Sequence, residues 1–244
     1  MLDRGTTLDA LREGELEIVG RIVASSNNAM LVTVTRTCPD PEPMLVFDAI
    51  YKPALGERPL DDFPDGTLAH REVAAWHVSE ASGWGIVPPT ILREGPFGEG
   101  MVQAFVEADP EVDVVAMVVE DDARLRRMAV LDAVMNNTDR KGGHILPVEG
   151  GRHVYGVDHG VCFSPVPKLR TVLWGWRGTP LAADEIDGLE RIRAALDGAL
   201  AESLAGLLSR AEIRATARRT DAMLASGRFP FPSPDWPAIP WPPF

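Results

Sequence analysis

Cysteine is scarce in this sequence, and its scarcity excludes several classes of protein. The 244 residues include two cysteines, Cys38 and Cys162, which form no CxxC pair. Neither a zinc ribbon nor a disulfide framework is therefore expected, and a reducing, cytoplasmic location fits. No run reaches the roughly 18 apolar residues that a membrane-spanning helix needs, so no stable membrane insertion is expected. The acidic N-terminal stretch lacks the apolar core of a signal peptide.

Positive charge is also in short supply. Lys and Arg number 24 against 36 Asp and Glu, which gives a net charge of -12. Bulk charge therefore argues against nucleic acid as a partner and against an anionic membrane surface. The remaining composition, 45% apolar and 25% charged, is ordinary for a globular protein that is long enough to bury a core.

The first hundred or so residues follow a strand-rich pattern. Thr67 is expected to cap a helix that ends near Gly83. Segments rich in β-branched and apolar residues, bounded by turn-forming residues, predict antiparallel strands. These segments are 15–23, 30–36, 44–52, 85–95 and 100–108. The predicted order is therefore β-β-β-α-β-β.

The rest of the chain is mainly helical in its pattern. Residues 121–139 and 184–227 carry apolar side chains at helical spacing. A short hairpin lies between these two segments. In the second segment one face carries Leu189, Ile192, Leu196, Leu200, Leu204 and Leu207. The tail, 229–244, is rich in proline and aromatic residues, which predicts an extended surface segment, with a proline-rich docking ligand as the alternative.

A lysine and a glutamate in the first part could serve a nucleotide. Lys52 ends an apolar strand, and Glu72 lies 20 residues later on the predicted helix. An ion pair between them would hold the ammonium group on phosphate oxygens. The alternative is a solvated lysine at the end of a strand and an unrelated surface glutamate.

Two aspartates lie in polar turns of the second part. Asp139 could accept a hydrogen bond from an acceptor hydroxyl, with Arg140 bracing the turn. Asp158 follows an apolar run and precedes His159, so its carboxylate could bind magnesium. An Asx-turn and an ordinary hairpin aspartate are the alternatives.

Two further stretches carry weaker signals. Ser25 and Ser26 could offer hydroxyl and backbone N–H donors to phosphate, or form a plain polar turn. A basic and aromatic cluster follows Asp158 where a substrate-reading segment could lie, although its tryptophans could instead pack in the core. The cluster comprises Lys168, Arg170, Trp174, Trp176 and Arg177.

Taken in order, these motifs resemble a known family. The strand-end lysine, the helical glutamate, "DRKGGH" and then "VDHG" resemble the catalytic core of phosphatidylinositol 3- and 4-kinases, whose atypical kinase fold the toxin-type bacterial serine kinases share. Most of the chain is similar to actinobacterial proteins described as phosphatidylinositol 3-/4-kinase-like. The resemblance implies one α+β domain over 1–244 with a bilobal, protein-kinase-like fold. It implies an N-lobe at 1–106, with an antiparallel sheet and one helix, and a mainly helical C-lobe at 107–244.

The resemblance also implies roles for single residues. Lys52 would contact the α- and β-phosphates of ATP, Glu72 would hold Lys52, Asp139 would be the catalytic aspartate, and Asp158 would bind Mg²⁺ or Mn²⁺. Adenine would meet a hinge that comprises Gln103, Phe105 and Val106. His144 replaces the metal-binding asparagine of the kinases, and His159 replaces the phenylalanine of their metal motif. Imidazole at 144 favours softer metals such as manganese.

Three functions remain open at this level. The first is an ATP-dependent phosphotransferase that acts on a protein or small-molecule hydroxyl rather than an inositol lipid, because the chain is acidic. The second is an inactive nucleotide-binding pseudokinase or scaffold. The third is a metal-dependent hydrolase that uses Asp139, His144, Asp158 and His159.

Overall fold

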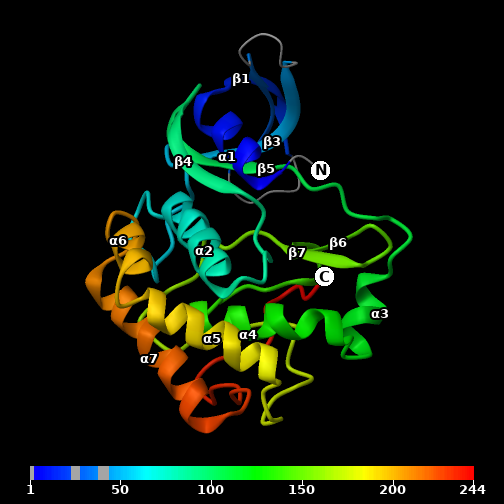
Figure 1. The fold of residues 1–244 in the computed structure, drawn as a ribbon, viewed down its shortest axis with the longest axis vertical. Coiled ribbons are helices and arrows are strands. Elements are labelled where there is room, and N and C mark those ends of the chain that lie inside the picture. Colours follow the sequence, from blue (N-terminus) through cyan, green and yellow to red (C-terminus); the bar gives the residue numbers. More distant parts are fainter. Residues whose placement is uncertain (1–2, 23–27, 38–43) are drawn as a thin grey trace. The chain divides into compact units, whose positions relative to one another are not determined.

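The computed structural model describes residues 3–22, 28–37 and 44–244. The chain divides into two compact units. Figure 1 labels their helices and strands and colours them by position in the sequence. The first unit comprises Met1–Val73 and Pro88–Phe105, and the second comprises Ala74–Val87 and Val106–Phe244. Residues 74–87, which the sequence pattern groups with the N-terminal part, thus belong to the second unit.

The first unit is built on a five-stranded antiparallel sheet, as the sequence predicts. The strand order is β1-β2-β3-β5-β4. The strands are β1 (Glu15–Arg21), β2 (Met30–Arg36), β3 (Leu45–Pro53), β4 (Thr90–Gly95) and β5 (Gly98–Ala104). The predicted fourth strand starts later than expected. Pro88 and Pro89 lie just before it, and proline has no N–H to donate to a sheet.

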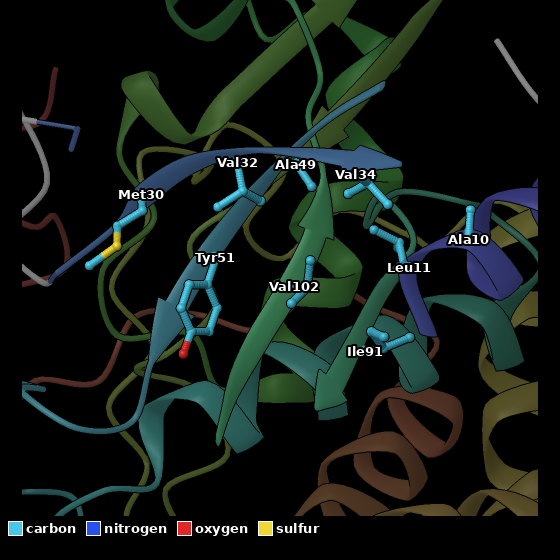
Figure 2. Packing of buried hydrophobic residues seen from close by; sticks show 9 residues of the cluster. All are labelled: Ala10, Leu11, Met30, Val32, Val34, Ala49, Tyr51, Ile91 and Val102. Atoms are coloured by element: carbon cyan, nitrogen blue, oxygen red, sulfur yellow. The ribbon is translucent and has the colours of Figure 1, made fainter. Parts of the chain in front are cut away.

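Alternation of side chains along the strands creates the core of this unit. Val32 and Val34 of β2 and Tyr51 of β3 are fully buried on one face (Figure 2). On the other face Thr33 donates a hydrogen bond to Asp48 over 3.3 Å. Successive strand residues point to opposite faces, so one face packs while the other carries polar groups.

A helix that the sequence analysis did not predict, α1 (Arg4–Glu13), completes the core. The carboxylate of Asp3 caps it by accepting a hydrogen bond from an N–H of the first turn. Ala10 and Leu11 of α1 are fully buried in the same cluster as the strand residues (Figure 2). The helix therefore closes the apolar face of the sheet.

The predicted helix after the third strand is α2 (Leu68–Ser82), but its cap differs from the prediction. The carboxylate of Glu57 accepts hydrogen bonds from the first two backbone N–H groups of the helix, over 3.0 and 2.8 Å. Thr67 instead donates its hydroxyl to the carbonyl of Pro64. A carboxylate can satisfy two N–H groups and complements the helix dipole, which explains why it takes the place of the threonine.

The second unit is mainly helical around one small hairpin. Its short 3₁₀ turns are η1 (Ala123–Leu125) and η2 (Gly142–His144), and its hairpin is β6 (Ile145–Val148) with β7 (His153–Gly156). The α-helices that lie wholly within it are α3 (Val114–Val119), α4 (Arg126–Met135), α5 (Ala183–Ala195), α6 (Ala199–Ala205) and α7 (Arg210–Ser226).

The long helix predicted over 184–227 is thus three helices. Gly198 caps the start of α6 and Gly206 follows its end, where the low helix propensity of glycine favours a break. Five of the six residues of the expected apolar face are nevertheless buried, with Leu189, Ile192 and Leu204 fully enclosed, whereas Leu207 is half-buried. Within the described part of the chain, no helix has the length and apolar character to cross a membrane.

Candidate functional site

The first unit contains the predicted pair of Lys52 and Glu72. Lys52 lies in β3, beside Met101 of β5, and Glu72 lies in the first turns of α2. The ammonium Nζ lies 2.6 Å from Oε1 of Glu72, with side-chain exposures of 18% and 2%. A charge-assisted bond of this length, largely shielded from water, fixes the position of the ammonium group.

The residues predicted to form an adenine-binding hinge differ in their hydrogen bonding. Gln103 is buried in β5, and its side-chain amide donates to the Thr90 hydroxyl over 2.8 Å. The N–H of Phe105 donates to the carbonyl of Asp48 over 3.0 Å. Within the described residues, Val106 makes no backbone hydrogen bond. Val106 therefore has backbone groups that an adenine ring could use. Ser25 and Ser26, predicted to contact phosphate, lie outside the described residues.

In the second unit, the loop that follows α4 positions Asp139. The helix ends at Asn136, which adopts the left-handed conformation that asparagine tolerates. The side-chain oxygen of Asn137 accepts the N–H of Asp139 over 3.0 Å, while its amide donates to Asp132 over 2.9 Å. The Asp139 carboxylate lies 3.0 Å from Nζ of Lys141. Asp139 is thus held from both its backbone and its side chain.

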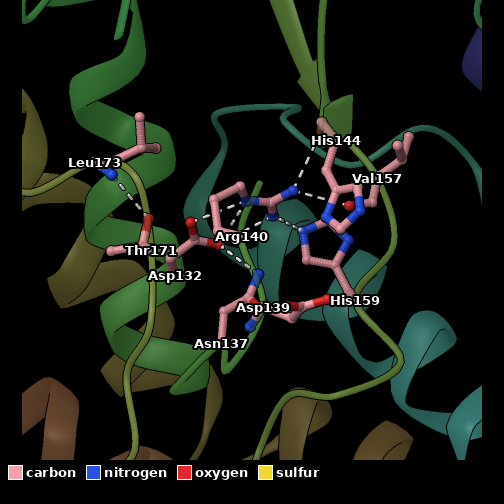
Figure 3. A network of polar contacts seen from close by, with 9 residues as sticks. All are labelled: Asp132, Asn137, Asp139, Arg140, His144, Val157, His159, Thr171 and Leu173. Carbon is pink, nitrogen blue, oxygen red and sulfur yellow. Dashed lines mark hydrogen bonds and ion pairs between the residues drawn. The ribbon is translucent and has the colours of Figure 1, made fainter. Parts of the chain in front are cut away.

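Arg140 forms the centre of a buried polar network (Figure 3). Arg140 and Asp132 are both fully buried, and Nε of the arginine lies 3.0 Å from Oδ2 of the aspartate. Burial lowers the pKa of Arg140, but the charge and hydrogen bonds of Asp132 outweigh this effect, so the pKa is raised overall. The guanidinium therefore remains charged and can only donate.

The same guanidinium holds the residues on either side of Asp158. Nη1 donates to the carbonyls of Val157 and His144 over 2.8 and 3.2 Å. Nη2 contacts Nε2 of His159 (Figure 3), and these two atoms lie 2.6 Å apart. Because a guanidinium only donates, Nε2 of His159 accepts and the ring proton is on Nδ1. Arg140 therefore acts on Asp158 as a positioning residue.

Asp158 and His144, the predicted metal ligands, lie side by side. Nε2 of His144 is 3.3 Å from Oδ2 of Asp158, whose side chain is 46% exposed. Burial lowers the pKa of His144, more than the charge of Asp158 raises it. A neutral imidazole next to a carboxylate is a set of donors that suits a divalent cation.

The pair alone does not make a complete metal site. Across the described ranges, no group of three or more His, Cys, Asp or Glu side chains is placed so that it could hold a metal ion. Magnesium in phosphoryl-transfer enzymes is commonly held by one or two carboxylates together with substrate phosphates. Asp158 and His144 thus fit a cation that arrives with a nucleotide, rather than one held by protein alone.

The structure argues against the four-residue hydrolase site. His159 is fully buried and its Nε2 is engaged by Arg140. Asp139 is paired with Lys141. A cation bound to Nε2 of His159 would have to displace Nη2 of Arg140 and would place a second positive charge next to the buried guanidinium.

Much of the basic and aromatic cluster at 168–177 is not accessible to a ligand. Trp174 and Trp176 are both buried, as the alternative prediction of core packing expected. Arg170 donates to the carbonyls of Pro237 and Ile239 in the tail. The cluster therefore supports the second unit and holds the tail.

Sequence reasoning missed the most buried acid of the site. Asp132 accepts hydrogen bonds from Arg140 and Asn137, yet the sequence analysis treated it only as part of the helical segment 121–139. The signal was present, since an aspartate within an otherwise apolar helix face needs a buried partner. The identity of that partner depends on the tertiary fold.

Comparison with solved structures defines the class of fold. The chain is similar to the Helicobacter pylori proinflammatory kinase CtkA, with a TM-score of 0.53 and 13% identity, covering 90% of this chain and 94% of that one. It is also similar to hydra Fam20 solved with sugar, with a TM-score of 0.55 and 13% identity, covering 90% and 86%. The chain has a protein-kinase-like fold.

A sequence relative defines the family. Protein Rv2133c of Mycobacterium tuberculosis (strain ATCC 25618 / H37Rv) is 42% identical over 269 residues, covering 96% of this chain and 94% of that protein. The chain belongs to the same family as Protein Rv2133c. No protein-family model matches the sequence.

Proposed function

We propose that this protein is an ATP-dependent phosphotransferase of the phosphatidylinositol 3-/4-kinase-like type, acting on a protein or small-molecule hydroxyl. The observation that carries the proposal is the 2.6 Å ion pair between Lys52 and Glu72, in a chain with a protein-kinase-like fold. A structural surface lysine has no need of a buried carboxylate, whereas a lysine that must meet phosphates needs a fixed position.

The chain's own residues divide the chemistry among them. Lys52 binds phosphate oxygens of ATP, and backbone groups of Val106 receive the adenine. Asp139 orients the acceptor hydroxyl and takes its proton as the oxygen–phosphorus bond forms and the bond to ADP breaks. Lys141, 3.0 Å from Asp139, places positive charge where the transferred group carries negative charge.

Asp158 and His144 are the residues that would hold a divalent cation. When bound, Mg²⁺ or Mn²⁺ neutralises charge on the phosphates. Arg140 keeps Asp158 in place through its bonds to the residues on either side. Its role is positional, because it is fully buried and cannot meet a substrate.

A protein or small-molecule acceptor is favoured over an inositol lipid. The chain carries a net charge of -12. In the basic cluster at 168–177, Lys168 lies over the Trp236 ring and Arg170 binds carbonyls of the tail. Anionic headgroups attract clustered, accessible cations, so these positions are poorly suited to them.

Matched substitutions test the proposal. Asp139→Asn and Asp158→Asn should each reduce metal-dependent ATP turnover at least a hundredfold. Asp187→Asn, at an exposed position of α5, makes the same chemical change away from the site and should retain full turnover. Unchanged turnover in both site variants would refute the assignment.

An inactive nucleotide binder is the second candidate, and two observations favour it. The carboxylate of Asp139 is already paired with Lys141, and the metal position carries an imidazole, His144. This candidate predicts a thermal shift with ATP and metal but no loss of ATP in a sensitive consumption assay. Measured together, the two assays separate the candidates.

A further inference from the structure

Residues 236–244, hereafter the strap, run along a surface of the second unit and end near β6 and β7 (Figure 1). The surface, hereafter the docking surface, comprises Gly142, Lys168, Arg170, Thr171 and Trp174. Its bonds to the strap are Gly142 N–H to Pro243, Thr171 N–H and the Trp174 indole to Ala238, and the Arg170 guanidinium to Pro237 and Ile239.

Every one of these hydrogen bonds runs in the same direction. The docking surface donates through backbone N–H groups, a guanidinium and an indole, and the strap accepts through carbonyls. Four residues of the strap are prolines, which have no N–H to give: Pro237, Pro240, Pro242 and Pro243. The docking surface is thus a row of donors that suits an extended, proline-rich chain, whose carbonyls have no internal partners.

The docking surface is attached directly to the loop that carries Asp139. The N–H of Arg140 donates to the carbonyl of Arg170 over 3.1 Å, and the N–H of Val172 donates to the carbonyl of Arg140 over 3.1 Å. A Cβ atom on Gly142 would overlap the ring of Phe244. Glycine at 142 therefore makes room for the end of the strap, three positions from Asp139 in the sequence.

The strap is held lightly for a segment so close to the site. Trp241 is 85% exposed, and Ile239 and Phe244 are also exposed. Trp236 lies under the ammonium of Lys168, whose Nζ is 4.3 Å from the ring centroid, and Pro240 is buried. A segment that contributes few side chains to a core can be exchanged for another of the same chemistry.

We propose that the docking surface binds an extended, proline-rich segment of an acceptor protein, and that the strap occupies it as an internal substitute. The acceptor role rests on the proposed phosphotransferase function. Binding of a proline-rich segment does not, because the contacts that carry it involve neither nucleotide nor metal.

Peptide binding to the full chain tests the docking surface. The probe is a fluorescein-labelled peptide with the sequence of residues 235–244, measured by anisotropy without nucleotide. The strap competes in the unmodified protein at a high effective concentration, so the probe should bind weakly there. A chain carrying Trp236→Ala and Pro240→Gly, which loosen its own strap, should bind the probe at least tenfold more tightly.

Two controls make the result specific. Pro234→Gly makes the same backbone change at an exposed position outside the strap and should leave probe affinity as in the unmodified protein. Arg170→Ala, added to the loosened chain, removes two donors and should weaken binding at least fivefold. Equal affinity for the unmodified and loosened chains, or no binding to the loosened chain, overturns the proposal; Trp236→Ala alone provides the same comparison if the double variant is unstable.

The acceptor role is tested with hydroxyl-bearing peptides. Because Phe244 lies against Gly142, a peptide with Phe244→Ser should receive phosphate from ATP at least tenfold faster than one with Ile239→Ser. ATP turnover that depends on Asp139 but labels neither peptide overturns the acceptor role. Absence of any ATP turnover counts against the phosphotransferase function, and the anisotropy result then decides the docking surface alone.

Discussion

Removal of the Arg140 guanidinium should destabilise the second unit by several kilocalories per mole. Arg140 and Asp132 are both fully buried and lie 3.0 Å apart. Arg140→Met keeps most of the side-chain volume, but among the described residues it leaves the amide of Asn137 as the one side-chain donor to the Asp132 carboxylate. Breaking a buried pair in this way costs about 3–5 kcal/mol.

The other acceptors raise the expected cost. The carbonyls of His144 and Val157 and the ring nitrogen of His159 all receive hydrogen bonds from Arg140. Each acceptor left unsatisfied in the interior costs about 1–3 kcal/mol, although such costs do not simply add. Domains are stable by only about 5–15 kcal/mol, so Arg140→Met should leave the second unit marginally folded.

Urea unfolding followed by tryptophan fluorescence measures this effect in the second unit. All six tryptophans lie there. Arg127→Met is a matched control in the same unit, because Arg127 pairs with Asp184 at an exposed position where an ion pair contributes about 0–1 kcal/mol. A loss below about 1 kcal/mol for Arg140→Met would refute the reasoning.

A double-mutant cycle tests the cause. Asp132→Leu combined with Arg140→Met removes both charges, so no buried carboxylate is left without its cation. The double variant should therefore be more stable than Arg140→Met alone, whereas independent sites would give the sum of the two losses. Simple additivity would show that charge pairing is not the source of the stability.

Three further predictions follow from other contacts. Lys52→Met and Glu72→Gln should each weaken ATP binding by roughly tenfold in a thermal-shift titration, about 1.4 kcal/mol, measured against each variant's own melting temperature without ATP. Lys52→Met should also lower that melting temperature, because it takes the ammonium group away from the buried Glu72 carboxylate. In metal-free protein the pKa of His144 is lowered, so as the pH falls the unfolded chain takes up a proton near pH 6.5, before the folded chain does. The free energy of unfolding should therefore be highest above pH 6.5 and fall below it, by no more than about 1.4 kcal/mol per pH unit. His144→Gln should flatten this slope in urea titrations at successive pH values. Asn136→Ala should cost about 2–4 kcal/mol in urea unfolding, because it removes three side-chain hydrogen bonds and a residue suited to the left-handed conformation; a loss under about 1 kcal/mol would contradict this.

The sequence predicted most strands and helices of this fold, because these elements depend on residues that are close together in the chain. The sheet follows from runs of β-branched residues, and the pairing of Lys52 with Glu72 follows from one residue at a strand end and another on the next helix. The division of the predicted helix at 184–227 could also have been predicted from the sequence, since Gly198 and Gly206 interrupt it. Helix α1 was missed although Asp3 supplies an ordinary cap.

The rest of the site could not be predicted, since it depends on contacts between distant parts of the chain. Arg140 meets Asp132, eight positions earlier, and His159, nineteen positions later. No periodicity in the sequence relates these three positions. Likewise, the capping of α2 by Glu57 in place of Thr67 depends on how the preceding loop folds back.

In each unit, contacts hold the candidate site residues in place, and this bears on whether the protein is active. Glu72 holds Lys52 in the first unit, and Asn137 and Arg140 hold the loops of Asp139 and Asp158 in the second. Disorder of the loops that carry Asp139 and Asp158 would therefore not be the cause of an absence of activity. The unusual chemistry is at His144, whose neutral imidazole favours softer cations than magnesium. Turnover with manganese but not with magnesium would thus identify an active enzyme with a changed metal preference, whereas turnover with neither would favour the pseudokinase.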